Sequence, residues 1–165
     1  MIPIVTSEYS ATWKIGKYLN DLLQPFVNKI LQPTTFRDEP DFIQKLHQYV
    51  HTDKRLRSTT LFCTLKISNY YALDQHNAMI DTVGHFLQDN LASNKFEQLT
   101  IQTIKNLLYI YLHYNIFYYN NKIYKLVKGS PTTMSLSETL STIYLFVWEN
   151  KITKELQSKN EFFGR

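Results

Sequence analysis

Residues 116–145, IFYYNNKIYKLVKGSPTTMSLSETLSTIYL, carry the clearest structural pattern in the sequence. Its first part alternates between apolar and polar residues on either side of Asn120 and Asn121. Asparagine tolerates positive φ, and such a dipeptide between two alternating runs is typical of a tight β-hairpin. The triplet Gly129-Ser130-Pro131 then ends the alternation. We therefore expect a hairpin made of residues 116–119 and 122–126, followed by a glycine turn.

The glycine turn is followed by a pattern with helical spacing. Apolar residues recur every three or four positions from about Leu136, which predicts a long amphipathic helix. Its expected apolar stripe is Leu140, Ile143, Tyr144, Val147, Trp148 and Ile152.

Upstream of the hairpin, four helices and one strand are expected. The first helix starts near Ile15, and Pro25 should kink or divide it; the second follows Asp38, with Phe42, Leu46 and Val50 on one face. A basic stretch then leads into a strand over residues 59–67. Asp74 and Thr100 are suited to cap the next two helices. Their expected buried residues are Ile80, Val83, Phe86 and Leu87 in the first, and Ile101, Ile104, Leu107, Leu108 and Tyr111 in the second.

This order predicts the α+β class, rich in helix, with a small antiparallel sheet and a β-hairpin. The chain has 165 residues, 44% of them hydrophobic, with 4 Gly and 5 Pro, which argues for one ordered domain. Its net charge of +4 and isoelectric point near 9.0 fit an anionic partner only weakly. The single cysteine, Cys63, excludes a disulfide framework and is expected to pack in the core.

The start of the chain has no basic region followed by a long apolar run, so a secretory signal is not expected. The most apolar stretch, residues 107–119, is shorter than the roughly 20 residues that cross a bilayer. We expect an intracellular protein, nuclear or cytoplasmic, without membrane partners.

Two further stretches carry a family resemblance. Residues 60–71, TLFCTLKISNYY, resemble the first palm motif of reverse transcriptases, with Lys66 at the position of a metal-binding aspartate and Tyr71 at the aromatic residue that follows. Residues 128–145 resemble the second palm motif, a glycine turn that opens a helix. The opening residues 2–19 look like the fingers segment of Penelope-like and related retroelement reverse transcriptases.

The resemblance implies an incomplete, RNA-directed DNA polymerase-like domain. Residues 1–58 would correspond to fingers and residues 59–165 to palm, with the chain stopping one residue short of the catalytic tyrosine-x-aspartate-aspartate hairpin. RNA or DNA would be the partner, no small-molecule cofactor is expected, and Mg²⁺ is implied for the intact family. An apolar strand over residues 59–67 would then lack its partner strands, so we expect the chain to aggregate or stay partly molten when isolated.

The residue at position 66 argues against polymerase activity. Nucleotide addition in this class needs two divalent ions held by palm carboxylates. Lys66 places a positive charge at that position, and at about 4 Å this repels a dication by on the order of several kcal/mol even at an effective dielectric near 20. Asp74 and Asp81 belong to the following helix and are not expected to replace the missing aspartate. We therefore expect no catalytic residue and no metal site in this chain.

Several residues remain candidates for binding. By resemblance, Tyr71, Gly129, Ser130 and Pro131 could contact a nucleotide, although Tyr71 could equally be a core residue. Six cationic residues could contact phosphates or form a solvated rim: Lys54, Arg55, Arg57, Lys122, Lys125 and Lys128. Five tyrosines could stack on bases or pack in the core and hairpin, and packing is favoured: Tyr109, Tyr111, Tyr114, Tyr118 and Tyr119.

Two other chemistries are less well supported by the sequence. His76 and His85 do not have the spacing of zinc ligands and are expected to be packed or solvated. Ser130 or Ser137 would need a positioned base to act as a nucleophile, and the sequence indicates none. The favoured hypothesis is a retroelement-derived reverse transcriptase-like fragment without polymerase activity; the alternative is a non-catalytic nucleic-acid- or protein-binding domain on the same scaffold. A third possibility is that a longer product supplies the missing parts of an active polymerase, although Lys66 argues against it.

Overall fold

A computed structural model describes residues 10–68, 74–130 and 133–165. Within them lie five α-helices: α1 (Trp13–Leu31), α2 (Glu39–His47), α3 (His76–Asn90), α4 (Ile101–His113) and α5 (Ser135–Ser158). Two short helical turns, η1 (Gln32–Thr34) and η2 (Gln48–Thr52), extend α1 and α2. The strands pair antiparallel as β1 (Lys95–Phe96) with β2 (Leu99–Thr100) and β3 (Ile116–Tyr119) with β4 (Lys122–Lys125). The α+β class and the antiparallel pairing predicted from the sequence are confirmed.

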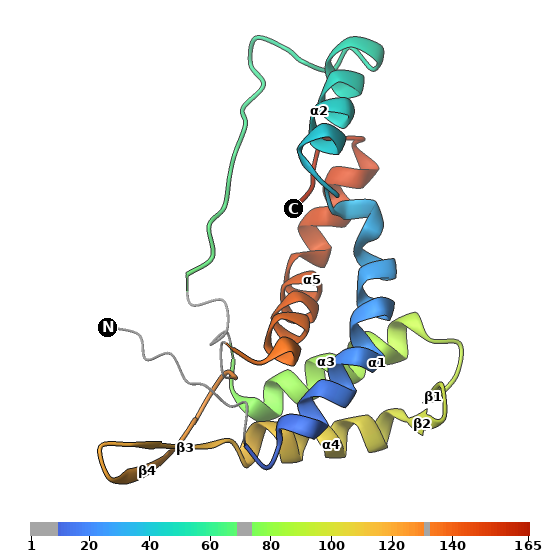
Figure 1. Cartoon of the computed structure of the whole chain (residues 1–165). Helices are drawn as coiled ribbons and strands as arrows, with labels where there is room; N and C mark the ends of the chain where they lie inside the picture. Colours follow the sequence, from blue (N-terminus) through green and yellow to red (C-terminus); the bar gives the residue numbers. More distant parts are fainter. Residues whose placement is uncertain (1–9, 69–73, 131–132) are drawn as a thin grey trace.

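Four helices build the core. Helices α3 and α4 lie side by side at one end of the molecule, and α1 and α5 rise from them toward α2 at the other end (Figure 1). The buried faces agree with the spacing of apolar residues in the sequence, since Leu23, Val83, Ile104 and Leu140 are all at most 1% exposed. Tyr111 of α4 is also fully buried, which raises its pKa to about 12.

Contacts between three phenylalanine rings join three of these helices. The Phe86 ring of α3 lies 6.1 Å from the ring of Phe26 in α1 and 5.6 Å from that of Phe146 in α5, both in edge-to-face geometry. Such pairs stabilise by about 0.5–1.5 kcal/mol beyond the burial of their area. Phe86 therefore links α3 to both long helices.

Helix α1 continues through Pro25 without being divided. Gly16 in its second turn lies against the Tyr111 ring, and an added Cβ would lie 2.5 Å from Tyr111 Cε2. Gly84 in α3 has different surroundings, because the nearest atom to an added Cβ is Cδ of the flexible Lys105 side chain at 3.1 Å.

We expect Gly16→Ala and Gly84→Ala to change stability in opposite directions. Alanine favours a helix over glycine by about 0.8–1.0 kcal/mol, and Gly84→Ala should gain most of this. In Gly16→Ala the clash with the buried Tyr111 ring should cost about 1–3 kcal/mol and exceed that gain. Urea unfolding of the two variants measures both effects; stabilisation by Gly16→Ala would show that α1 does not approach α4 this closely.

The upper end of the molecule has its own small cluster. Asp38 caps α2 by accepting from the backbone N–H of Asp41 at 2.8 Å, as residues of this type do at helix starts. The backbone N–H of Arg37 and the Lys45 ammonium lower the pKa of the Asp41 carboxyl to about 2. Phe42 of α2 packs on Phe36 and Phe162, with ring centroids 5.1 and 5.7 Å away.

The last residue of the chain is attached to the segment after α1. The Arg165 backbone donates to Thr34 O at 3.1 Å and accepts from the Phe36 N–H at 2.8 Å. The Arg165 guanidinium also forms an ion pair with Glu149 of α5 at 2.5 Å. These contacts hold the C-terminal residues against the cluster around Phe36.

The strand predicted over residues 59–67 is wrong. The described part of this segment contains no paired strand, and its apolar side chains are exposed, with Leu61 at 85% and Leu65 at 84%. Cys63 is exposed as well, which contradicts the expectation of core packing. The physical reason is that the β-branched and aromatic residues of this segment favour extended backbone, whereas a strand also needs a partner. Among the described residues, β3 and β4 pair with each other instead.

Two further features of the fold are local to single helices. Asp74 does not cap α3, contrary to expectation, because Gln75 occupies the N-cap position and makes no side-chain cap bond. The apolar stripe of α5 is buried only in its first half, and Val147, Trp148 and Ile152 are 40–60% exposed.

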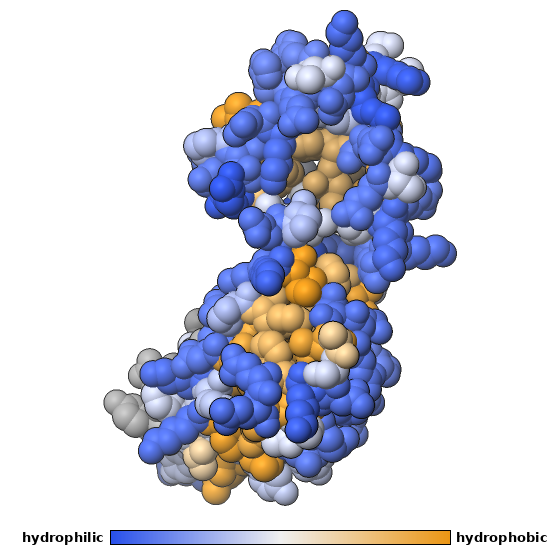
Figure 2. All heavy atoms as spheres, turned by 90° about the vertical axis from the view of Figure 1, so that its right-hand side faces the viewer, coloured by the Kyte–Doolittle hydropathy of each residue, from blue (hydrophilic) through white to orange (hydrophobic). Residues whose placement is uncertain are grey.

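On the face seen in Figure 2, hydrophobic side chains gather over the lower part of the molecule, where α3 and α4 lie, and hydrophilic ones dominate the upper part.

Among the described residues, no helix is both long enough and apolar enough to cross a membrane.

Candidate nucleic-acid interface

The β3–β4 hairpin forms in the register that the sequence predicted. Asn120 and Asn121 occupy the turn with φ of 51° and 58°, and Tyr119 pairs with Lys122 on either side of them. Two consecutive residues with positive φ fit the right-handed twist of a two-residue hairpin. The rings of Phe117 and Tyr124, which are opposite each other, stack with centroids 5.5 Å apart.

Side chains alternate between the two faces of the hairpin, and each face has aromatic and cationic groups. One face carries Phe117, Tyr119, Lys122 and Tyr124; the other carries Ile116, Tyr118, Ile123 and Lys125. Lys122 and Lys125 therefore point to opposite faces rather than forming one cationic row. Lys128 lies beyond β4 and pairs with Gln75 in an isolated antiparallel bridge.

The hairpin projects away from the helices (Figure 1), and its tyrosines are exposed. Tyr118 and Tyr119 are 68% and 69% exposed, so the prediction that the tyrosine run packs in the core and hairpin fails for them. It is confirmed for Tyr111, which is buried, whereas Tyr109 and Tyr114 are exposed. No acidic residue occurs in residues 113–128, so the whole projection is cationic.

Buried hydrogen bonds fix the base of the hairpin to two helices. Asn115, just before β3, accepts from the Thr12 hydroxyl at 2.7 Å and donates to Tyr111 O at 2.5 Å. Gly129 adopts φ of 68°, which favours glycine, and its N–H donates to Asp74 O at 3.1 Å. Its carbonyl accepts from His76 Nε2 at 2.9 Å. The glycine turn is therefore a structural anchor of the hairpin.

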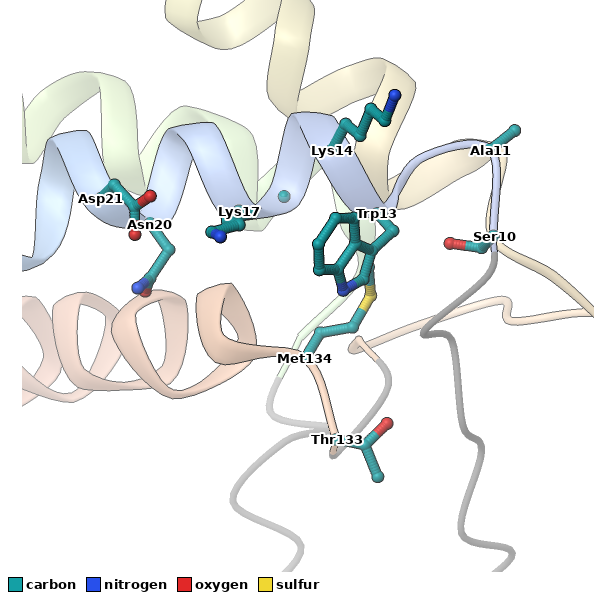
Figure 3. A pocket seen from close by; sticks show the side chains of 10 residues that line it. Ser10, Ala11, Trp13, Lys14, Lys17, Asn20, Asp21, Thr133 and Met134 are labelled. Atoms are coloured by element: carbon teal, nitrogen blue, oxygen red, sulfur yellow. The ribbon is translucent and has the colours of Figure 1, made fainter.

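A hollow beside the start of α1 adds a second group of aromatic and cationic side chains. It has a volume of about 1050 Å³ and lies between the first turns of α1 and residues Thr133 and Met134 before α5 (Figure 3). At the edge of this hollow the Trp13 side chain is 37% exposed, and Lys17 Nζ lies 5.6 Å from the centre of the Trp13 ring. Lys14 and Asp21 also line it.

The sequence pattern alone did not predict this hollow. Trp13 followed by lysines one and four positions later was an available signal, because residues at i and i+4 lie on one face of a helix. The Thr12–Asn115 hydrogen bond connects the start of α1 to the start of β3. The hollow beside α1 therefore lies next to the point where the hairpin leaves the helices.

The basic stretch before residue 59 is not part of this surface. Lys54, Arg55 and Arg57 follow η2 at the upper end, whereas the hairpin lies at the lower end (Figure 1). Arg55 donates to Lys159 O at 2.6 Å and pairs with Glu161 at 3.6 Å, so it connects this stretch to the end of α5. Lys54 and Arg57 are exposed.

The remaining candidates are spread over several places. Lys66 is exposed in the extended segment, while Tyr71 and Pro131 lie outside the described residues. Ser130 is half-buried near the Tyr111 hydroxyl, and Ser137 is fully buried, with its Oγ 3.4 Å from the same hydroxyl. His85 is exposed and His76 is buried, as expected for histidines that are solvated or packed.

In residues 10–68, 74–130 and 133–165 no three His, Cys, Asp or Glu side chains come together as metal ligands.

Comparison with known protein families, with curated proteins and with solved structures gave no match for this chain.

Proposed function

We propose that this chain is a reverse transcriptase-like fragment derived from a retroelement, one that does not polymerise nucleotides. The observation that carries the proposal is the succession of two helices, a tight hairpin, a glycine turn and a long helix at the spacing of the palm motifs. In the structure these elements are α3, α4, β3–β4, the turn at Gly129 with φ of 68°, and α5. The exposed segment around Lys66 differs from a palm, which would need a strand there.

The lack of polymerisation follows from charge. Lys66 stands where the resemblance requires an aspartate, and a lysine neither binds a divalent ion nor tolerates one nearby. No Mg²⁺-dependent step is therefore assigned to any residue of this chain.

Primer extension on an RNA template with Mg²⁺ and with Mn²⁺ tests this proposal. The chain itself is expected to add no nucleotides. A Lys66→Asp version, extended at its C-terminus by an aspartate-containing catalytic hairpin, should recover measurable extension if the scaffold is that of a reverse transcriptase. The same extended chain with Lys66 retained is the matched control and should be inactive. Nucleotide addition by the unaltered chain would refute the assignment.

A second candidate function is binding of single-stranded nucleic acid without catalysis. The specific observation in its favour is the projecting hairpin, where Tyr118 and Tyr119 are exposed beside Lys122 and Lys125 and no acidic residue is present. Exposed aromatic rings stack on bases of any sequence, and lysines contact the phosphates between them. This function requires no metal ion.

A further inference from the structure

Two histidines from different helices meet at the base of the hairpin. His76 is the first residue of α3, His113 is the last residue of α4, and their ring centroids are 5.0 Å apart with the planes at 73°. Both rings line a hollow of about 280 Å³, together with Gln75, Asn77 and Lys125. Spacing in the sequence drew attention to His76 with His85 and gave no sign of this pair.

A backbone carbonyl fixes the tautomer of each ring. His76 Nε2 lies 2.9 Å from Gly129 O, and His113 Nδ1 lies 3.2 Å from Tyr109 O. Because a carbonyl oxygen only accepts, each of these nitrogens carries the hydrogen, and in the neutral imidazoles Nδ1 of His76 and Nε2 of His113 keep a lone pair. Burial lowers the pKa of His76 and favours its neutral form.

This is the arrangement that histidine ligands of metals adopt. A ligating histidine typically donates its other ring N–H to a carbonyl or carboxylate, which orients the ring and raises the basicity of the ligating nitrogen. Two imidazoles that share a tetrahedral zinc ion, each with a metal–nitrogen distance of about 2.0 Å, have ring centres roughly 5 Å apart. The observed separation of the two ring centroids, 5.0 Å, is close to this value.

We propose that His76 and His113 bind a divalent transition-metal ion of the zinc class at the base of the β3–β4 hairpin. Water or the amide oxygens of Gln75 and Asn77, which line the same hollow, would complete the coordination. The ion would join the start of α3 to the end of α4 beside the glycine turn. The proposal is independent of whether the chain binds nucleic acid.

The chemistry of the hollow distinguishes a cation from an anion. Two lone pairs attract a metal ion and repel a phosphate, whereas the Lys125 ammonium has the opposite preference. Lys125 is exposed on β4 and can move aside on its flexible side chain. Lys125→Ala should therefore tighten the binding of a metal ion, while it would weaken the binding of an anion.

A second histidine pair has to be removed before the measurement. His47 and His51 are exposed, with ring centroids 4.4 Å apart, and histidines four residues apart on a helix can bind zinc by themselves. The starting protein is therefore the full chain with His47→Ala and His51→Ala. No backbone carbonyl partner is seen for these two rings among the described residues, so they lack the support that orients His76 and His113.

Calorimetric titration of this protein with Zn²⁺ alone tests the proposal. We expect one Zn²⁺ per chain, affinity lowered about tenfold or more by His76→Ala and by His113→Ala, and no change in His85→Ala. Titration with inorganic phosphate is the opposing arm. Binding of phosphate that Lys125→Ala weakens, or Zn²⁺ binding that survives both histidine substitutions, would overturn the proposal.

Loss of binding through misfolding is excluded by a second measurement that keeps both rings. In NMR spectra of the same starting protein, Zn²⁺ should shift the ring proton signals of His76 and His113 and leave those of His85 in place. Shifts confined to His85, or the absence of any shift, would refute the site whether or not the alanine variants fold.

Discussion

Replacing Phe86 with alanine is expected to lower the free energy of unfolding by about 3–5 kcal/mol. The Phe86 ring is 1% exposed and contacts Phe26 and Phe146, so the change removes one buried ring and leaves two others facing a cavity. Since domains of this size are stable by only about 5–15 kcal/mol, the variant should be largely unfolded at moderate urea concentrations. Urea unfolding followed by circular dichroism measures the shift.

Phe42→Ala is the matched control. It removes the same side chain at the upper end, where Phe42 is 39% exposed and packs on Phe36 and Phe162. We expect a decrease of about 1 kcal/mol, since much of this ring is already in contact with water. Equal decreases in the two variants, or unfolding without cooperativity in the unaltered chain, would contradict a packed four-helix core. The second result would instead support the aggregating or partly molten state expected from the sequence.

The parts of the fold that were predictable are those fixed by neighbours in the sequence. Asn120 and Asn121 determine the hairpin because the turn itself needs two residues with positive φ. Thr100 caps α4 because its hydroxyl reaches the backbone N–H of Thr103, three residues later, at 3.1 Å. Helical spacing identified the buried faces of α3 and α4 for the same reason.

The errors concern contacts between distant residues. Residues 59–67 have the composition of a strand, but composition does not supply a partner strand. Trp148 and Ile152 continue the apolar stripe of α5 but are exposed, unlike its first half, which packs against α1 and α3. Periodicity alone could not reveal their exposure. Asp74 is not the cap because α3 starts at His76, which leaves Gln75 at the N-cap position. The backbone carbonyl of Asp74 instead accepts from the N–H of Gly129, a tertiary contact absent from the local sequence.

The candidate sites show the same difference between features set by sequence neighbours and contacts between distant residues. The lysines of the hairpin were predictable, but their positions on opposite faces follow from the register of Lys122 and Lys125 in β4. The pairs Thr12–Asn115 and His76–His113 join residues that are far apart in the chain, and no spacing rule connects them. They follow from the packing of helices α1, α3 and α4, which only a structure provides.

Substituting both exposed hairpin tyrosines, Tyr118→Ala with Tyr119→Ala, is expected to weaken binding of single-stranded RNA by roughly thirtyfold or more. Stacking of a base on an aromatic side chain contributes about 1–3 kcal/mol, and each of these rings is more than two-thirds exposed on its face of the hairpin. Fluorescence anisotropy of a labelled oligonucleotide at fixed salt concentration gives the affinities. Single-stranded DNA should behave similarly, because stacking does not depend on the 2′-hydroxyl.

The dependence of RNA affinity on salt concentration should distinguish the contribution of the lysines from that of the tyrosines. Removing one phosphate-binding ammonium group, by Lys122→Ala or Lys125→Ala, should reduce the slope of log affinity against log salt by about 0.7, whereas the tyrosine substitutions should leave the slope unchanged. Lys151→Ala with Lys154→Ala is the charge control, since both lysines are exposed on the distal part of α5, away from the hairpin. If that control reduces the slope equally per lysine, net charge rather than the hairpin attracts the strand. A hairpin that binds through both stacking and phosphate contacts requires the tyrosine and lysine variants to differ in this way.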